Sequence, residues 1–180
     1  AIAVYGVKGV NFSEWWNVGI GLVWSIIGTF IISVLITKIF RKFIYKINNN
    51  KIKKAQIIST CGMSFMHGAQ DGQKFIGILI IFMCLLKNVQ IPEIVLPTDY
   101  FNVIIFTAII MAIGVSIGGR KIVENIGTDM VSLNIQEGLF SDITTVITLL
   151  IASLTGLPVS TTHAKTISII GVGKANRKQI

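Results

Sequence analysis

Long uninterrupted runs of apolar residues constrain this chain more than any other feature of its sequence. They fall at about residues 16–40, 75–86, 100–117 and 143–154. The first is longer than the roughly 20 residues that cross a bilayer as a helix, and the third is close to that length. Only 13% of the residues are charged, and mean hydropathy is +0.74. Because the runs are continuous and do not alternate every second residue, a β-barrel is excluded. The sequence predicts an all-α integral membrane protein.

The positive charges are concentrated in one short loop. The chain carries a net charge of +8, which in a soluble protein would suggest a nucleic-acid partner. Here the basic residues crowd together directly after the first apolar run, a pattern typical of cytoplasmic loops of membrane proteins. We therefore predict no nucleic-acid partner, a multi-pass protein of the cytoplasmic membrane, and contact of this loop with anionic lipid. The loop residues are Lys38, Arg41, Lys42, Lys46, Lys51, Lys53 and Lys54.

The basic loop divides the chain into two predicted parts. Residues 1–54 would form a leading loop, a first transmembrane helix and the basic loop itself. Residues 55–180 would hold a second crossing that is interrupted before its apolar half, and a third crossing at about 100–117. A more polar stretch would follow as an interfacial or partly buried helix at about 121–134. The interruption of the second crossing is predicted from its charges and from Gly62, Gly68 and Gly72.

The last apolar run is predicted to be broken as well. At 1.5 Å per residue, a helix over about 143–154 is too short to cross the bilayer. The segment Thr155-Gly156-Leu157-Pro158 would end it, and a second short helix would cover about 160–172. Two interrupted helices, broken or re-entrant, point to a binding site near the middle of the membrane.

The first interruption carries charged and polar residues that are costly within a membrane. Asp71 supplies a carboxylate, while Gln70, Gln73 and carbonyls freed at the glycines would supply further oxygens. Hard oxygen ligands of this kind suit a small cation or a proton. The alternative is an ion pair between Asp71 and Lys74, three residues apart, and the two interpretations are compatible.

The second interruption has the opposite electrostatic character. Ser160, Thr161 and Thr162 fall where a helix begins after Pro158. Backbone N–H groups at a helix start carry partial positive charge, and hydroxyl groups can donate beside them, so the segment suits an anion. Ordinary capping of the helix is the alternative.

Two histidines lie within these polar segments. His67 and His163 could relay protons, since histidine titrates near neutral pH, or could hydrogen-bond between helices. Enzyme chemistry is not expected, because the sequence has no H-E-x-x-H pattern and Asp71 has no partner carboxylate nearby. No cofactor is expected beyond a coupling ion.

Both polar segments resemble those of the inorganic phosphate transporter (PiT or Pho4) family of sodium- or proton-coupled symporters. The matching stretches are His67-Gly68-Ala69-Gln70-Asp71-Gly72-Gln73-Lys74 and Gly156-Leu157-Pro158-Val159-Ser160-Thr161-Thr162-His163. Family members contain two inverted repeats, each with one copy of both segments. The resemblance therefore implies that this chain is one half of an inverted-repeat transporter, the C-terminal repeat without its last helix, and an internal piece of a longer protein.

The resemblance also implies roles for individual residues. Asp71, Ser160, Thr161 and Thr162 would contact inorganic phosphate, and Gln70, Asp71 and Gln73 would lie near the coupling cation, sodium or a proton. The N-terminal repeat would complete the site, and a homodimer is left open.

The chain departs from the family pattern at two positions. Gln70 stands in place of the usual asparagine, and Lys74 stands where many members have a second asparagine. We hypothesise that the Lys74 ammonium replaces one bound cation. Transport of sulfate or another tetrahedral oxyanion, and sensing of phosphate without transport, remain the alternative functions.

Overall fold

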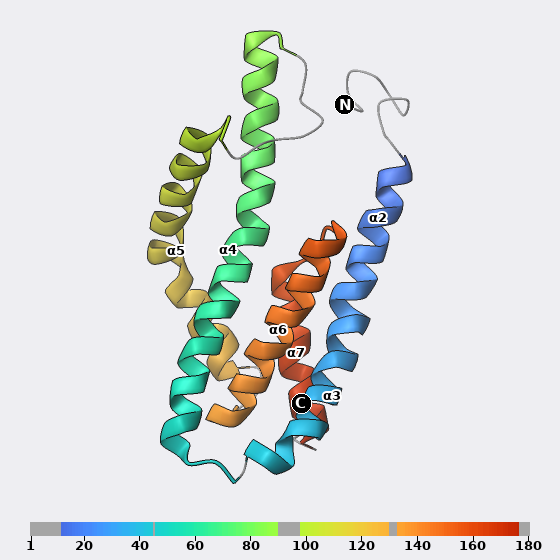
Figure 1. Cartoon of the computed structure of the whole chain (residues 1–180), viewed down its shortest axis with the longest axis vertical. Helices are drawn as coiled ribbons and strands as arrows, with labels where there is room; N and C mark the ends of the chain where they lie inside the picture. Colours follow the sequence, from blue (N-terminus) through green and yellow to red (C-terminus); the bar gives the residue numbers. More distant parts are fainter. Residues whose placement is uncertain (1–11, 45, 90–97, 130–132, 177–180) are drawn as a thin grey trace. The chain divides into compact units, whose positions relative to one another are not determined.

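The computed structural model describes residues 12–44, 46–89, 98–129 and 133–176, and these contain helices and turns but no strand (Figure 1). The side chains of residues 13–14 and 120–129 are not part of the description. Four helical segments, Trp15–Ile44, Asn49–Lys87, Phe101–Gly119 and Ile135–Thr155, are long and apolar enough to cross a membrane. The prediction of an all-α multi-pass membrane protein is therefore confirmed.

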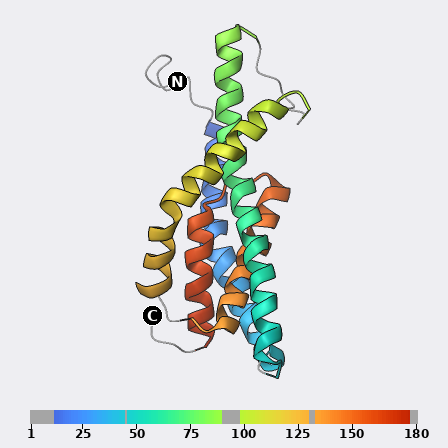
Figure 2. The ribbon, with the colours of Figure 1, turned by 90° about the vertical axis from the view of Figure 1, so that its left-hand side faces the viewer.

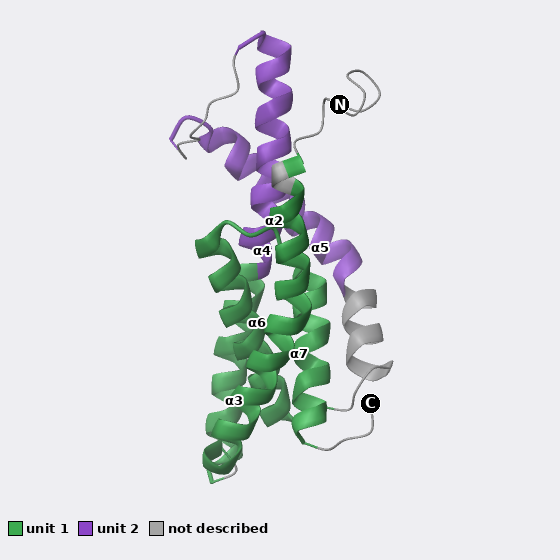
Figure 3. Ribbon diagram, turned by 90° about the vertical axis from the view of Figure 1, so that its right-hand side faces the viewer, with its two compact units in different colours: residues 1–66, 133–180 green, residues 67–132 purple. Residues whose placement is uncertain are grey.

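The chain divides into two compact units (Figure 3). The first comprises residues 1–66 and 133–180, and the second comprises residues 67–132. The sequence analysis instead divides the chain at residue 54, into two consecutive stretches. The compact units are not consecutive in sequence, so they do not test that division, and it stays a prediction.

The first crossing forms one long helical run in the first unit. It consists of α2 (Phe12–Val23), the π-helical turn η2 (Trp24–Gly28) and α3 (Thr29–Ile44), which confirms the expected crossing at 16–40. Its fully buried positions recur every four residues and carry hydroxyl groups, whereas most of its large apolar side chains are exposed. This pattern is the reverse of that in a soluble protein, and it is expected of a helix whose outer face contacts lipid. The buried hydroxyl residues are Ser25, Thr29, Ser33 and Thr37.

Helices α6 (Ile135–Thr155) and α7 (Thr161–Ala175) form a hairpin in the same unit. They lie side by side and run in opposite directions (Figures 1 and 2). Their open ends are joined where Asn176 Nδ2 donates to Glu137 Oε1 at 2.9 Å. The chain thus enters and leaves this hairpin at the same end, beside α3.

The predicted start of α6 near residue 143 is wrong. The helix begins at Ile135, so it has 21 residues and is long enough to cross a membrane. Polar residues of the first two turns of α6 are buried within the unit, among them Glu137, Ser141 and Asp142. Glu137 also fixes the helix start, because its Oε2 accepts from the Asn134 backbone N–H at 2.7 Å. The second short helix, expected over 160–172, is confirmed as α7.

The predicted interruption of the second crossing is also wrong. Helix α4 runs without a break from Asn49 to Lys87 and passes through all three glycines. A helix tolerates glycine at a modest cost in stability, and the charged side chains in this stretch pair with one another along the helix. No break is therefore required. The carbonyls of Gly68 and Gly72 therefore belong to a regular helix, contrary to the expectation that they are freed for a cation. Helix α5 (Phe101–Asp129) contains the third crossing and continues through most of the stretch predicted as a separate interfacial helix.

Candidate functional site

The loop between α6 and α7 is shaped by its own sequence. Gly156 adopts the left-handed conformation, with φ of 68°, which glycine allows without steric cost. The Leu157 N–H then donates to the Ala152 carbonyl at 3.0 Å, which closes the end of α6. Pro158 follows and prevents the helix from continuing. The chain is thereby turned back so that α7 begins at Thr161.

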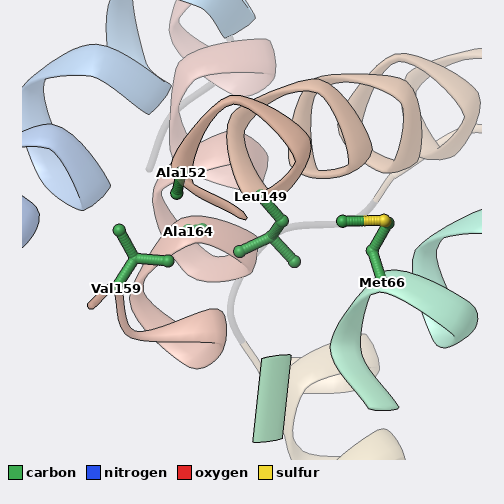
Figure 4. Packing of buried hydrophobic residues seen from close by; sticks show 5 residues of the cluster. All are labelled: Met66, Leu149, Ala152, Val159 and Ala164. Carbon is green, nitrogen blue, oxygen red and sulfur yellow. The ribbon is translucent and has the colours of Figure 1, made fainter. Parts of the chain in front are cut away.

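The loop is anchored in a small apolar core (Figure 4). Val159 is buried and packs with Leu149 and Ala152 of α6 and with Ala164 of α7; Met66 of α4 completes the cluster. On the other side the loop meets α2 at Gly21, where an added Cβ would overlap the Pro158 carbonyl. The position of the α7 start is therefore fixed by packing on two sides.

The predicted anion-binding residues lie at this helix start. The Ser160 side chain accepts a hydrogen bond from the His163 backbone N–H at 3.3 Å, so Ser160 is the N-cap. Thr161 is buried, whereas Thr162 and His163 are exposed. The capping alternative thus accounts for Ser160, and the exposed Thr162 hydroxyl lies beside the positive end of the helix dipole. Binding of phosphate at this end remains a prediction.

The first predicted cluster lies on α4, in the second unit; His67, Asp71 and Lys74 share one face of the helix, and Gln73 lies on another. The Asp71 carboxylate has two partners on its own helix: His67 Nε2 lies 3.1 Å from Oδ2, and Lys74 Nζ donates to Oδ1 at 3.0 Å. The predicted ion pair between Asp71 and Lys74 is therefore present. Gln70 is buried and Gln73 is exposed. A cation at Gln70, Asp71 and Gln73 stays a prediction, and so does a proton relay through His67 or His163.

The two predicted clusters belong to different compact units, with Asp71 in one and Ser160 to Thr162 in the other. The structure describes the surroundings of each cluster separately. Their contribution to one common site is consequently a prediction from the sequence.

A third polar cluster, in the first unit, was missed by the sequence analysis. Lys165 of α7 donates to Asp142 Oδ1 of α6 at 2.5 Å. The other carboxylate oxygen of Asp142 accepts from α4, from Thr60 Oγ1 at 2.6 Å, Gln56 Nε2 at 3.2 Å and Ser59 Oγ at 3.4 Å. An aspartate beside a strongly apolar run is the signal that could have drawn attention to this cluster, since such a charge is costly in a membrane.

A model of the phosphate transporter family matches residues 45–180. The chain belongs to the phosphate transporter family. This finding confirms the resemblance inferred from the two polar segments.

Curated relatives agree with the family assignment. A protein of Bacillus subtilis (strain 168), named "probable low-affinity inorganic phosphate transporter", is 30% identical over 98% of this chain and 53% of its own length. A protein of the same name from Rhizobium meliloti (strain 1021) is 33% identical over 88% of this chain and 45% of its own length. A "sodium-dependent phosphate transporter 1-A" of Danio rerio is 30% identical over 66% of this chain and 18% of its own length.

The chain spans about half the length of the two bacterial relatives. These relatives are transporters by name. No solved structure matches the chain.

Proposed function

We propose that the protein containing this chain carries inorganic phosphate across the cytoplasmic membrane together with a cation, sodium or a proton. The observation that carries this proposal is the start of α7, where a hydroxyl-rich segment follows Pro158 at the positive end of a packed helix. Family membership and the names of the relatives support phosphate as the substrate.

Chemistry favours phosphate over sulfate as the transported oxyanion. Sulfate has no proton at neutral pH, so it offers only hydrogen-bond acceptors. Phosphate retains a proton and can donate to an acceptor such as the Asp71 carboxylate. In this proposal Asp71, Ser160, Thr161 and Thr162 contact phosphate, and a second repeat of the same protein supplies the other half of the site.

Electrostatics explains why a cation would accompany phosphate. A phosphate anion and the Asp71 carboxylate repel each other strongly where water is scarce. A cation or a proton near Gln70, Asp71 and Gln73 would remove that repulsion. Coupling is then a condition of binding the anion at all.

The direct test is uptake of radiolabelled phosphate by the full-length protein in proteoliposomes, driven by a sodium gradient or a proton gradient. Thr162→Val should reduce uptake at least about tenfold, as expected for loss of a hydrogen bond to a charged group. Thr155→Val is the matched control, because within the described part of the chain the Thr155 hydroxyl donates to carbonyls of its own helix, and uptake should be unchanged. Asp71→Asn should abolish accumulation.

The outcomes separate the alternatives. Accumulation under one gradient identifies the coupling ion. Saturable phosphate binding without accumulation under either gradient would favour a sensor, and inhibition of uptake by sulfate at equal concentration would contradict the phosphate selectivity.

A further inference from the structure

The cluster around Asp142 combines a buried carboxylate with a lysine ammonium inside the helix bundle of the first unit. The side chain of Asp142 is 5% exposed and that of Lys165 is 19% exposed. The Lys165 ammonium donates to two oxygens, Asp142 Oδ1 at 2.5 Å and Ser141 Oγ at 3.0 Å. A carboxylate at this depth requires a positive partner, because an unpaired buried charge is strongly destabilising.

The surroundings of the ammonium are unusually rich in hydroxyl oxygens. Ser141 Oγ lies 2.7 Å from Ser168 Oγ, and Thr145 Oγ1 lies 3.0 Å from the same Ser168 oxygen. All three of these residues are at most 1% exposed. The Ser168 carbonyl in turn accepts from Ser33 Oγ of α3 at 2.7 Å, so the hydroxyl groups extend across three helices.

The carboxylate also has a polar wall on its α4 side. Thr60, Ser59 and Gln56 all donate to Asp142 Oδ2. The Gln56 carbonyl oxygen is buried and accepts no hydrogen bond among the described residues. Gln56 lies close against α6 because Gly138 has no side chain; a Cβ at that position would come within 2.8 Å of Gln56 Nε2.

A simple structural ion pair would not need this environment. Joining α6 to α7 requires one carboxylate and one ammonium, with apolar neighbours to fill the space. Here the groups near the pair are hydroxyl, carboxylate and amide groups, and hard oxygen atoms of these types are the ligands that bind small cations in proteins. The charge that occupies this environment is +1, the charge of a sodium ion.

We propose that the Lys165 ammonium is a tethered cation that occupies an oxygen-lined site for a monovalent cation, centred on Asp142 and Ser141. Lys165 is then a specificity-determining residue, since it removes the need for a soluble cation at this position. In the proposed symporter, this would be a second cation position, permanently filled by the lysine. Only this physiological role rests on the proposed function. The site itself requires neither phosphate nor transport.

The test is sodium binding to a variant that lacks the tethered charge. Lys165→Met keeps an unbranched side chain, one atom shorter, but leaves the Asp142 carboxylate without its ammonium. In the purified full-length protein, without phosphate, the midpoint of thermal unfolding should rise by about 3–5 °C when choline chloride is replaced by sodium chloride at equal ionic strength, beyond any rise in the wild type. Folding of the variant only in sodium would be the same result in stronger form.

Two control variants make the test decisive. Lys165→Arg retains a positive charge, and Asp142→Asn combined with Lys165→Met removes both charges, so neither should gain sodium-specific stabilisation. The proposal is overturned if Lys165→Met is folded and gains no more from sodium than the wild type does. It is also overturned if Lys165→Met fails to fold in both salts, whether or not the double variant folds, because the bundle would then need the lysine itself. None of these measurements uses phosphate uptake. They would therefore remain valid if the proposed transport function were wrong.

Discussion

At the scale of single residues, the position of the α7 start depends on a glycine in another helix. Gly21 of α2 lies so close to the Pro158 carbonyl that no side chain fits between them. The contact joins the first crossing to the loop that precedes Ser160, and this loop is also held by Val159 in the apolar core. Gly21, which has no side chain, therefore helps to set the position of the candidate anion-binding groups.

Gly21→Ala is expected to destabilise the protein. The new methyl group would overlap the Pro158 carbonyl oxygen, and relief requires the loop or α2 to move, at a cost of about 1–3 kcal/mol. The midpoint of thermal unfolding should fall accordingly. Gly19→Ala is the matched control in the same helix, because apart from the neighbouring helix backbone no described atom lies within 4 Å of a Cβ at that position. Equal midpoints for the two variants would refute the steric argument.

At the scale of elements, the unexpected continuity of α4 leads to a further prediction. Gly68 is helical, and apart from its neighbours in the helix backbone no described atom lies within 4 Å of an added Cβ there. Gly68→Ala should therefore stabilise the helix by up to about 1 kcal/mol and should leave phosphate uptake near the wild-type level. Thermal unfolding and uptake of the same preparation check both parts. A stable variant that has lost uptake would show that α4 must bend at this glycine during transport, or that another group must approach its backbone closely.

The errors in α4 and α6 have one physical cause. The sequence shows which residues are polar but not which partners they reach in the fold. In α4 the Asp71 carboxylate has partners on its own helix, His67 and Lys74, so the predicted interruption is unnecessary. In α6 the partners of Asp142 and Glu137 come from distant parts of the chain, such as Lys165 and Asn176.

The parts predicted correctly depend on local or compositional rules. Apolar runs locate the membrane crossings, and the proline loop with its following hydroxyl groups locates the start of α7. The buried hydroxyl residues of α2–α3 recur every four positions and were visible in the sequence. Their burial could not be inferred, because in a soluble helix the same pattern would mark an exposed face.

At the scale of the whole molecule, the number of positive charges near the carboxylates determines what the proposed transporter must take from solution. The first unit carries Lys165 beside Asp142, and the second carries Lys74 at 3.0 Å from Asp71. Each ammonium neutralises a carboxylate that would otherwise attract a cation or a proton. The two differ in exposure: the side chain of Lys165 is 19% exposed and that of Lys74 is 45% exposed. We therefore expect Lys165 to be a fixed partner and Lys74 to be the more easily displaced one.

This difference predicts the effect of Lys74→Asn on the full-length protein. Without the ammonium, the Asp71 carboxylate keeps His67 and gains an amide oxygen beside it, a better ligand set for sodium. Phosphate uptake should then become more dependent on sodium, with a severalfold larger ratio of uptake in sodium to uptake in choline than in the wild type. Lys87→Asn is the matched control, since Lys87 lies in the last turn of the same helix and is exposed, and it should leave the ratio unchanged. An unaltered ratio in Lys74→Asn, with the protein folded and active, would show that the Lys74 ammonium does not stand in for a coupling cation.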